Sequence, residues 1–300
     1  MNNRPDCIPC CLRRVLHTAD VVSDDEWLHR KILGEVMQDL CRVDELMTPA
    51  EMIFSISRKA SKTLGVTDPF AAEKKRWSDE VNGNLDVIRA KVDESPDPFR
   101  KALELSLAAN LIACETRDGL VRAGHGSASG FNLVSLLAEV DALPFADENV
   151  EDFRESVAQA DRILFVHDAA GELFFDRLLI ETLQKPADSV ASVVRESPIL
   201  GCATREDAKA FGIDEVARVI DPGIACLGVP LSACSKGFRE DYAAASLVIA
   251  KGQAAYETLE GDSVELDGSA KETYFLLRVR CDVMARQLGV AVGDCVLEPN

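Results

Sequence analysis

From about residue 150 onward, short apolar runs alternate with segments of helical periodicity. The runs that read as strands are Ile163–Val166, Val190–Val194, Val216–Ile220, Leu247–Ile249 and Tyr274–Val279. Helical segments follow from Gly171 to Leu183, from near Thr204, and from Cys281 to Leu288. Such alternation predicts an α/β fold whose mostly parallel sheet is covered by helices on both faces, in three layers.

The first half of the chain carries helix signals instead. Ser23 precedes three acidic residues, and Thr48-Pro49, Pro69 and Pro98 each precede residues with apolar side chains at helical spacing. Strand signals are sparse there. We therefore expect a helical N-terminal domain over residues 1–150, packed on an α/β domain over residues 151–300 that carries the pocket.

The net charge of the chain argues against some classes of binding partner. The net charge is −18, from 51 acidic and 33 basic residues, and no basic run offsets it. An acidic surface repels nucleic acid and anionic lipid, so we expect neither as a partner. No segment has the roughly 18 apolar residues that span a bilayer, and no signal peptide is evident, so we expect a cytoplasmic protein. The oligomeric state is not readable from the sequence.

Polar or flexible residues follow several predicted strands. Asp168 follows the first strand, Arg195 the second, and Lys251 ends the fourth. The carboxyl ends of parallel strands meet at one edge of a sheet, which is where α/β proteins bind ligands. An Asp there can bind a divalent cation, and a Lys nearby can neutralise a phosphate. Singly, each has an ordinary alternative, because Asp168 can cap the next helix and Lys251 can be solvated.

Taken together and in order, these segments resemble the damage-control phosphatase family, in its compact archaeal and bacterial branch. The matching segments are Cys7-Ile8-Pro9-Cys10, Asp68-Pro69-Phe70, Ala109–Ile112, His167–Ile180, Lys251–Leu259 and Cys281–Asp294. The resemblance spans nearly the whole chain. It implies a helical N-terminal part on an α/β part, and metal-dependent hydrolysis of small phosphorylated metabolites.

The resemblance also implies roles for individual residues. Asp168, Lys251 and Arg195 are expected to be catalytic, and Gly171, Glu172, Gln253 and Asn110 to bind substrate. A hard divalent metal (Mn, Mg, Co or Ni) is expected on Asp168 and Asp176, with Asp221 as the nearest substitute for a lost carboxylate. The expected partner is a small anionic or phosphorylated metabolite.

The chain departs from the family pattern where the metal ligands are expected. Ala169 stands where the family has Asn, Gly201-Cys202 where it has Asn-Asp, and Ala255 where it has Asn. Ala113 and Ile224-Ala225 also replace polar residues. Magnesium and manganese need a near-complete shell of oxygen ligands. The sequence thus predicts that the phosphatase activity is impaired or changed.

Two alternatives follow from the replacements. Cys202 stands at a lost polar position, with Cys114 and Cys226 beside two others, and Cys7 and Cys10 have metal-ligand spacing. Thiolates select zinc, copper or iron–sulfur clusters, so one hypothesis is a soft-metal or redox protein on the same fold. The other is a pseudoenzyme that binds a small ligand or a partner. A plain explanation also remains: Ala and Cys fill space that polar groups have left.

Overall fold

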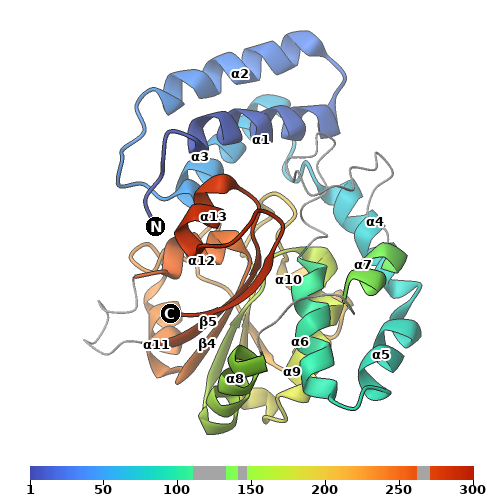
Figure 1. The fold of residues 1–300 in the computed structure, drawn as a ribbon. Coiled ribbons are helices and arrows are strands. Elements are labelled where there is room, and N and C mark those ends of the chain that lie inside the picture. The colour runs from blue at the N-terminus through green and yellow to red at the C-terminus, as the bar shows by residue number, and fades with distance from the viewer. Residues whose placement is uncertain (111–132, 141–146, 262–270) are drawn as a thin grey trace.

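The computed structural model describes residues 1–110, 133–140, 147–261 and 271–300. Its strands are β1 Ile163–Val166, β2 Val190–Val193, β3 Arg218–Ile220, β4 Leu247–Lys251, β5 Glu272–Arg278 and β6 Cys295–Pro299. They form one sheet in the order β3-β2-β1-β4-β5-β6 (Figure 1). Strands β1 to β5 run parallel, and β6 pairs antiparallel with β5 at the edge. The predicted fold class is confirmed.

The strand order reverses between β1 and β4. From β1 the chain moves outward to β2 and β3, then returns to place β4 on the other side of β1. Val166, the last residue of β1, pairs with Val193 on one side and Ala250 on the other. The segments that leave these strands therefore diverge and open a crevice, which is the usual ligand site of such sheets.

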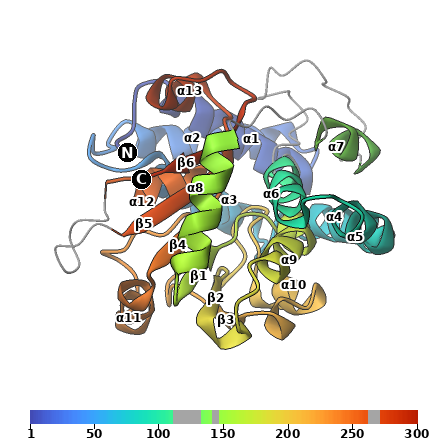
Figure 2. The same cartoon turned by 60° about the horizontal axis from the view of Figure 1, so that its bottom comes forward.

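The alternating side chains of β1 reach both faces of the sheet. Ile163 and Phe165 enter one hydrophobic cluster, and Leu164 and Val166 enter the other. The first cluster is covered by α4 Ala71–Asn82, α5 Leu85–Asp93, α6 Pro98–Ala109, α7 Leu133–Val140, α8 Asp147–Gln159, α9 Leu173–Thr182 and α10 Arg205–Ala210. The second is covered by α11 Lys236–Ala244, α12 Gln253–Leu259 and α13 Asp282–Leu288 (Figures 1 and 2).

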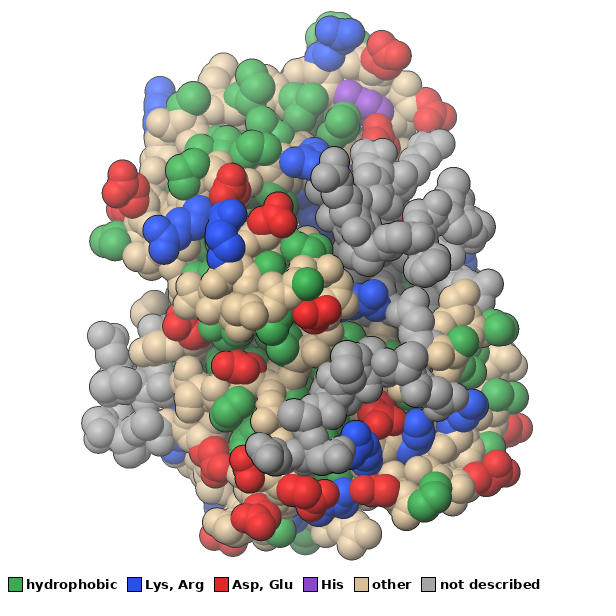
Figure 3. Space-filling model, in the orientation of Figure 1, with side chains coloured by type: hydrophobic (Ala, Val, Ile, Leu, Met, Phe, Trp, Pro, Cys, Tyr) green, Lys and Arg blue, Asp and Glu red, His purple; other side chains and the backbone are tan. Residues whose placement is uncertain are grey.

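The first three helices form a part of their own. They are α1 Cys7–Val22, α2 Glu26–Leu40 and α3 Pro49–Leu64, and they share a separate hydrophobic cluster that also takes in Val283 of α13. In Figure 1 they lie at the top, beyond α12 and α13. Figure 3 shows apolar side chains gathered on their outer face.

The hydrophobic clusters do not divide at residue 150. Trp77 of α4, Leu103 of α6 and Leu136 of α7 lie in the same cluster as Phe165 of β1. Helices α4 to α7 belong to the layer over the sheet, because their apolar faces pack on it. The division between clusters falls after α3, well before the predicted domain boundary.

Local signals behave as the sequence predicts, with small shifts. Thr48 caps α3 in a capping box with Glu51, and Thr204 caps α10. The N-cap of α2 is Asp25 rather than Ser23. The edge strand β6 was not predicted, because it is short and contains Glu298 and Pro299. Within the described residues, no helix combines the length and apolarity needed to cross a membrane.

Candidate functional site

The site is built around Asp168, two residues beyond the end of β1. Its carboxylate lies against the turn that follows β4, where Gly252 has a φ of 82°. A Cβ atom on Gly252 would lie 2.0 Å from the Asp168 Oδ2 atom. The turn therefore requires glycine at position 252 for two reasons, the positive φ and the close approach of the Asp168 carboxylate.

Two side chains hold the Asp168 carboxylate. Asn110, at the end of α6, donates from Nδ2 to Asp168 Oδ2 over 3.0 Å. Arg280, between β5 and α13, places Nη2 3.4 Å from the same oxygen. Asn110 is fully buried and also donates to Glu172 Oε1 over 3.0 Å, while its Oδ1 accepts from the backbone N–H of Arg278. Asn110 thus joins the tips of β1 and β5.

Behind Asp168 lies a fully buried polar network. The Lys251 ammonium donates to Asp176 Oδ1 over 2.6 Å and to the Ser106 carbonyl over 2.7 Å, and lies 2.6 Å from Glu172 Oε2. The ammonium thus donates two hydrogen bonds and forms ion pairs with both carboxylates. His167 contacts Asp176 Oδ2 through Nδ1 at 2.8 Å and Ser192 through Nε2 at 3.1 Å.

The charges in this network shift one another's protonation. Burial lowers the pKa of Lys251, but the carboxylates of Asp176 and Glu172 outweigh it and raise the pKa overall. Burial raises the pKa of Asp176, but Lys251 and His167 outweigh it and lower the pKa. Glu172 keeps a pKa raised by burial and by the charges of Asp168 and Asp176. Lys251 is thus held charged, with Asp176 as its main counter-ion.

A pocket of about 650 Å³ opens above Asp168, between the first helices and the strand ends. We call the strand-tip residues Asp168, Ala169, Gly201 and Cys202 the pocket floor. The other walls carry cationic, apolar and acidic side chains. Those used below are Arg13, Arg14, Trp77, Gln253, Glu257, Arg280 and Arg286.

Three of the four floor positions carry no oxygen ligand. Ala169 and Cys202 face one another in an isolated antiparallel bridge. Burial raises the pKa of the Cys202 thiol to about 12, with the charge of Asp168 adding to the effect. A Cβ atom on Gly201 would lie 2.8 Å from the ring of Trp77, so the indole has taken the space of a side chain there.

This strand-tip geometry, with its Asp, Asn and Lys at the ends of β1, α6 and β4, can be compared with known proteins. A family model described as the damage-control phosphatase ARMT1-like domain matches residues 4–296. The chain belongs to this damage-control phosphatase family. Similar relatives include an uncharacterized protein of Methanocaldococcus jannaschii, 31% identical over 98% of this chain and 94% of its own length.

Other family members match over nearly their whole length. A damage-control phosphatase of Archaeoglobus fulgidus is 30% identical over 99% of this chain and 98% of its own. The crystal structure of a DUF89 family protein from Pyrococcus horikoshii superposes with a TM-score of 0.83 at 28% identity, covering 100% of this chain and 99% of that one. The family and its fold are therefore shown, whereas the residue roles remain predictions.

The pocket floor does not fit the hard divalent metal expected of a damage-control phosphatase. Asp168 supplies its only carboxylate, and one oxygen of that group is already occupied by Asn110 and Arg280. A hard cation takes about six oxygen ligands, of which water can supply several, and this floor offers it one carboxylate oxygen that none of the described side chains holds. Among the described residues, no group of three or more His, Cys, Asp or Glu side chains could hold a metal ion.

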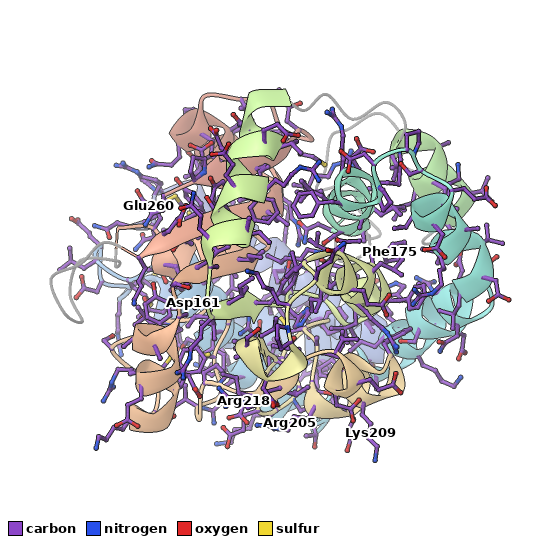
Figure 4. The ribbon with its side chains drawn as sticks, turned by 90° about the horizontal axis from the view of Figure 1, so that it is seen from below. Asp161, Phe175, Arg205, Lys209, Arg218 and Glu260 are labelled. Carbon is purple, nitrogen blue, oxygen red and sulfur yellow. The ribbon has the colours of Figure 1, made fainter. Side chains whose placement is uncertain are left out.

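The other predicted hard-metal ligands lie elsewhere. Asp176 is fully buried behind the pocket in the Lys251 network. Asp221 lies beyond β3, where Arg205 donates to it from Nε over 2.9 Å. Figure 4 shows Arg205 close to Arg218 of β3 at the outer rim of the α/β part. The structure does not bring Asp221 to Asp168, because β3 is two strands away from β1.

The predicted soft-metal ligands are also dispersed. Cys202 lies in the floor, and Cys7 and Cys10 line the pocket from α1. Cys226 is buried outside the pocket lining, with its thiol donating to the Gly228 carbonyl, and burial raises its pKa. Cys114 lies outside the described residues. These positions do not form a cluster that suits a metal.

The remaining predicted site residues divide between the pocket and its support. Gln253 lines the pocket, whereas Gly171 and Glu172 are buried in the turn that precedes α9. Arg195 is 2% exposed and donates to the His167 carbonyl over 3.3 Å. Lys251 does not line the pocket either, because three acceptors hold it behind Asp168. The prediction that it contacts a phosphate is not met by this geometry.

Two pocket residues were not predicted from the sequence. Arg280 supplies the counter-charge to Asp168, and its position just before the Cys281 block was the available signal. Glu257 is buried in the pocket wall, accepts from Gln253 Nε2 over 2.8 Å, and has a pKa raised by burial to about 7. It stood inside the family segment that begins at Lys251, but periodicity could not show that it faces a pocket.

Proposed function

We propose that this chain binds a small phosphorylated or anionic metabolite in the pocket, and that its metal-dependent phosphatase activity is strongly reduced. The observation that carries the proposal is the pocket floor, where the skeleton of a phosphatase site holds a single carboxylate. That carboxylate is neutralised by Arg280, at 3.4 Å, rather than left free for a cation. A metal-dependent phosphohydrolase is the expected activity of the family, and this floor argues against it here.

Cationic side chains support an anionic ligand. Arg13 and Arg14 line the pocket from α1, and Arg280 and Arg286 line it from the α13 side. The lining also holds Asp6, Glu73, Glu257 and Asp282, and Arg286 forms an ion pair with Asp6. Burial raises the pKa of Glu73 and of Glu257, which favours their neutral forms, so the arginines supply the charge that attracts a small anion to this concave site.

Chemistry in such a site is limited to binding and orientation. Arginine side chains bind phosphate through paired N–H donors. Asp168 would accept from a hydroxyl or amine on the ligand. The soft-metal alternative is less well supported, because the cysteines are dispersed and the thiols of Cys202 and Cys226 are held in their neutral form.

The direct test measures binding and turnover on the same protein. We expect some member of a panel of phosphate monoesters to raise the Tm of the chain without added metal. We also expect little phosphate release with Mn²⁺, Co²⁺ or Ni²⁺. Rapid phosphate release that disappears in Asp168→Ala would contradict the proposal that hydrolysis is strongly reduced. The absence of a Tm shift with every phosphate ester of the panel would contradict the proposal of ligand binding.

A gain-of-ligand variant sharpens this test. Ala169→Asn combined with Cys202→Asp restores oxygen ligands at two floor positions, and Gly201 is left because of the Trp77 ring. We expect this variant to bind Mn²⁺ measurably by calorimetry where the parent does not. Ala254→Asn is the matched control, since it adds an amide beside the floor at a position where the family pattern has no fixed residue. Equal Mn²⁺ binding by the parent and both variants would contradict the proposal.

A further inference from the structure

One side of the pocket is apolar. Several residues that line it also belong to a small hydrophobic cluster, and we call them the apolar wall: Ile53, Leu200, Cys202, Leu227 and Ala254. They come from α3, from the segments that follow β2 and β3, and from the start of α12. Ile53, Leu200 and Ala254 are only half-buried. Apolar surface that remains open to a cavity favours a ligand that removes it from water.

The apolar wall begins next to the charged part of the floor. Ala169 pairs with Cys202 in the isolated bridge, so the wall starts one residue step across from Asp168. Burial raises the pKa of the Cys202 thiol to about 12, which keeps that thiol neutral. Arg280 places Nη2 3.4 Å from the Asp168 carboxylate. The same cavity therefore offers a ligand a cationic region and an apolar one.

Leu200 occupies the wall at a cost to its backbone. Its φ is 49°, in the left-handed region that a leucine rarely adopts, because there the Cβ atom approaches the following carbonyl oxygen. Glycine or asparagine would tolerate this conformation better. The position instead carries a half-buried apolar side chain that packs on the wall cluster. Strain of this kind is found where a side chain serves a function, which points to a role for Leu200 in the pocket.

The wall is poorly suited to a sugar. The side chains of Ile53, Leu200, Leu227 and Ala254 contain no nitrogen or oxygen atom, and the Cys202 thiol is a weak hydrogen-bonding group. A ligand hydroxyl placed against them would give up hydrogen bonds to water without gaining a side-chain partner. A hydrocarbon chain in the same place would lose nothing and would cover apolar surface.

We propose that the ligand is an amphiphilic anion, the phosphate monoester of a short aliphatic alcohol. Its phosphate lies among Arg13, Arg14 and Arg280, and its hydrocarbon tail covers the apolar wall. This inference rests on the proposed function and narrows the class of metabolite. A hydroxyl close to the phosphate would reach Asp168, so the apolar part is the far end of the ligand. A volume of about 650 Å³ holds a phosphate with a tail of several carbon atoms.

Calorimetry on the full chain without added metal tests the ligand class. The probes are methyl, propyl and hexyl phosphate, with glycerol 1-phosphate as the matched partner of propyl phosphate, since it has the same three-carbon chain with two hydroxyl groups. We expect the Kd to fall about threefold for each added methylene group. Propyl phosphate should bind about tenfold more tightly than glycerol 1-phosphate.

The outcomes separate this inference from the function on which it rests. Equal affinity for propyl phosphate and glycerol 1-phosphate, with no gain along the series, would overturn the amphiphilic ligand and leave the binding of phosphorylated metabolites intact. If none of the four phosphates bound, both proposals would be wrong.

A variant of Leu200 tests the position of the tail. Leu200→Asn tolerates the left-handed backbone and replaces a branched hydrocarbon with an amide of similar size. We expect it to keep the Tm of the parent and its affinity for glycerol 1-phosphate, but to bind hexyl phosphate about tenfold more weakly. Gln184→Asn is the matched control, because Gln184 has a φ of 53° but is exposed and lies outside the pocket lining.

The control variant should keep all the affinities of the parent. A gain with chain length in Leu200→Asn as large as in the parent would place the tail away from the wall and overturn the proposal. The unmodified chain carries the primary result, so the test does not depend on a variant that folds.

Discussion

The buried network behind Asp168 and the pocket floor above it are adjacent but differ in the number of their polar side chains. In the network, Lys251, Asp176 and His167 are fully buried, and each finds a partner within 3.1 Å. In the floor, the side chains of Ala169, Gly201 and Cys202 carry no oxygen atom. The network is thus built from charged and polar side chains, whereas the floor holds one carboxylate, that of Asp168.

The two regions also differ in how much a substitution would cost in stability. A buried charge whose partner is removed keeps its full desolvation cost, so changing one member of the network destabilises the fold. Floor side chains face a cavity, so their removal leaves no unpaired charge in the core. The same comparison predicts that variants of the two regions differ sharply in their effect on folding.

The largest expected effect is that of Lys251→Met. This change leaves Glu172 and Asp176 buried without the Lys251 ammonium, so the free energy of unfolding should fall by about 3–5 kcal/mol. Urea denaturation measures it. The matched control is Lys236→Met, at a lysine 86% exposed in an ion pair with Glu240, where we expect no measurable change. A loss at Lys251 no larger than at Lys236 would show that the network is not structural.

The second-largest effect is expected at Gly252, which lies where the buried network meets the pocket floor. Gly252→Ala forces an unfavourable φ and places a methyl group 2.0 Å from the Asp168 carboxylate. We expect a loss of about 2–4 kcal/mol, from the strained backbone and the clash together. Gly261→Ala is the control, because its φ is 80° with no neighbouring atom within 4 Å. The difference between the two variants isolates the contact with Asp168, and equal losses would contradict that contact.

Glu257 tests the pocket wall through pH. Burial raises its pKa from 4.5 to about 7, so between these values the folded chain keeps a proton that the unfolded chain releases. The free energy of unfolding should therefore fall as the pH rises across this window, by at most about 3 kcal/mol from this group. Glu257→Gln removes that contribution and should flatten the profile between pH 5 and 7.5. An unchanged slope in the variant would place the titration elsewhere, with Glu172 as the first candidate.

The fold could be predicted from the sequence because its signals are local. The apolar runs of β1, β2 and β4 are fully buried in a parallel sheet, which needs continuous rather than alternating hydrophobic residues. The division between hydrophobic clusters could not be predicted. Trp77 and Leu103 lie on helices whose periodicity shows an apolar face without showing what covers it.

The site could be predicted in position but not in detail. Asp168 and Gln253 line the pocket, as the strand ends indicated. Lys251 illustrates what the sequence cannot show, because the sequence pattern around a lysine at a strand end is the same whether the lysine faces a ligand or two buried carboxylates. Only the three-dimensional packing of Ser106, Glu172 and Asp176 around it decides between these. Long-range contacts of this kind leave no periodic signal.

The smallest expected effect belongs to Asp221, which the sequence offered as a substitute ligand. Its partner Arg205 is half exposed, and surface ion pairs contribute about 0–1 kcal/mol. Asn keeps the Oδ1 acceptor for the backbone N–H of Gly223, so Asp221→Asn should change neither stability nor the thermal shift caused by a bound phosphate ester. Asp168→Asn should abolish or alter that shift, because its carboxylate lies in the floor. If the two variants changed ligand binding equally, Asp221 would belong to the binding site. The predicted difference between Asp168 in the floor and Asp221 beyond β3 would then be wrong.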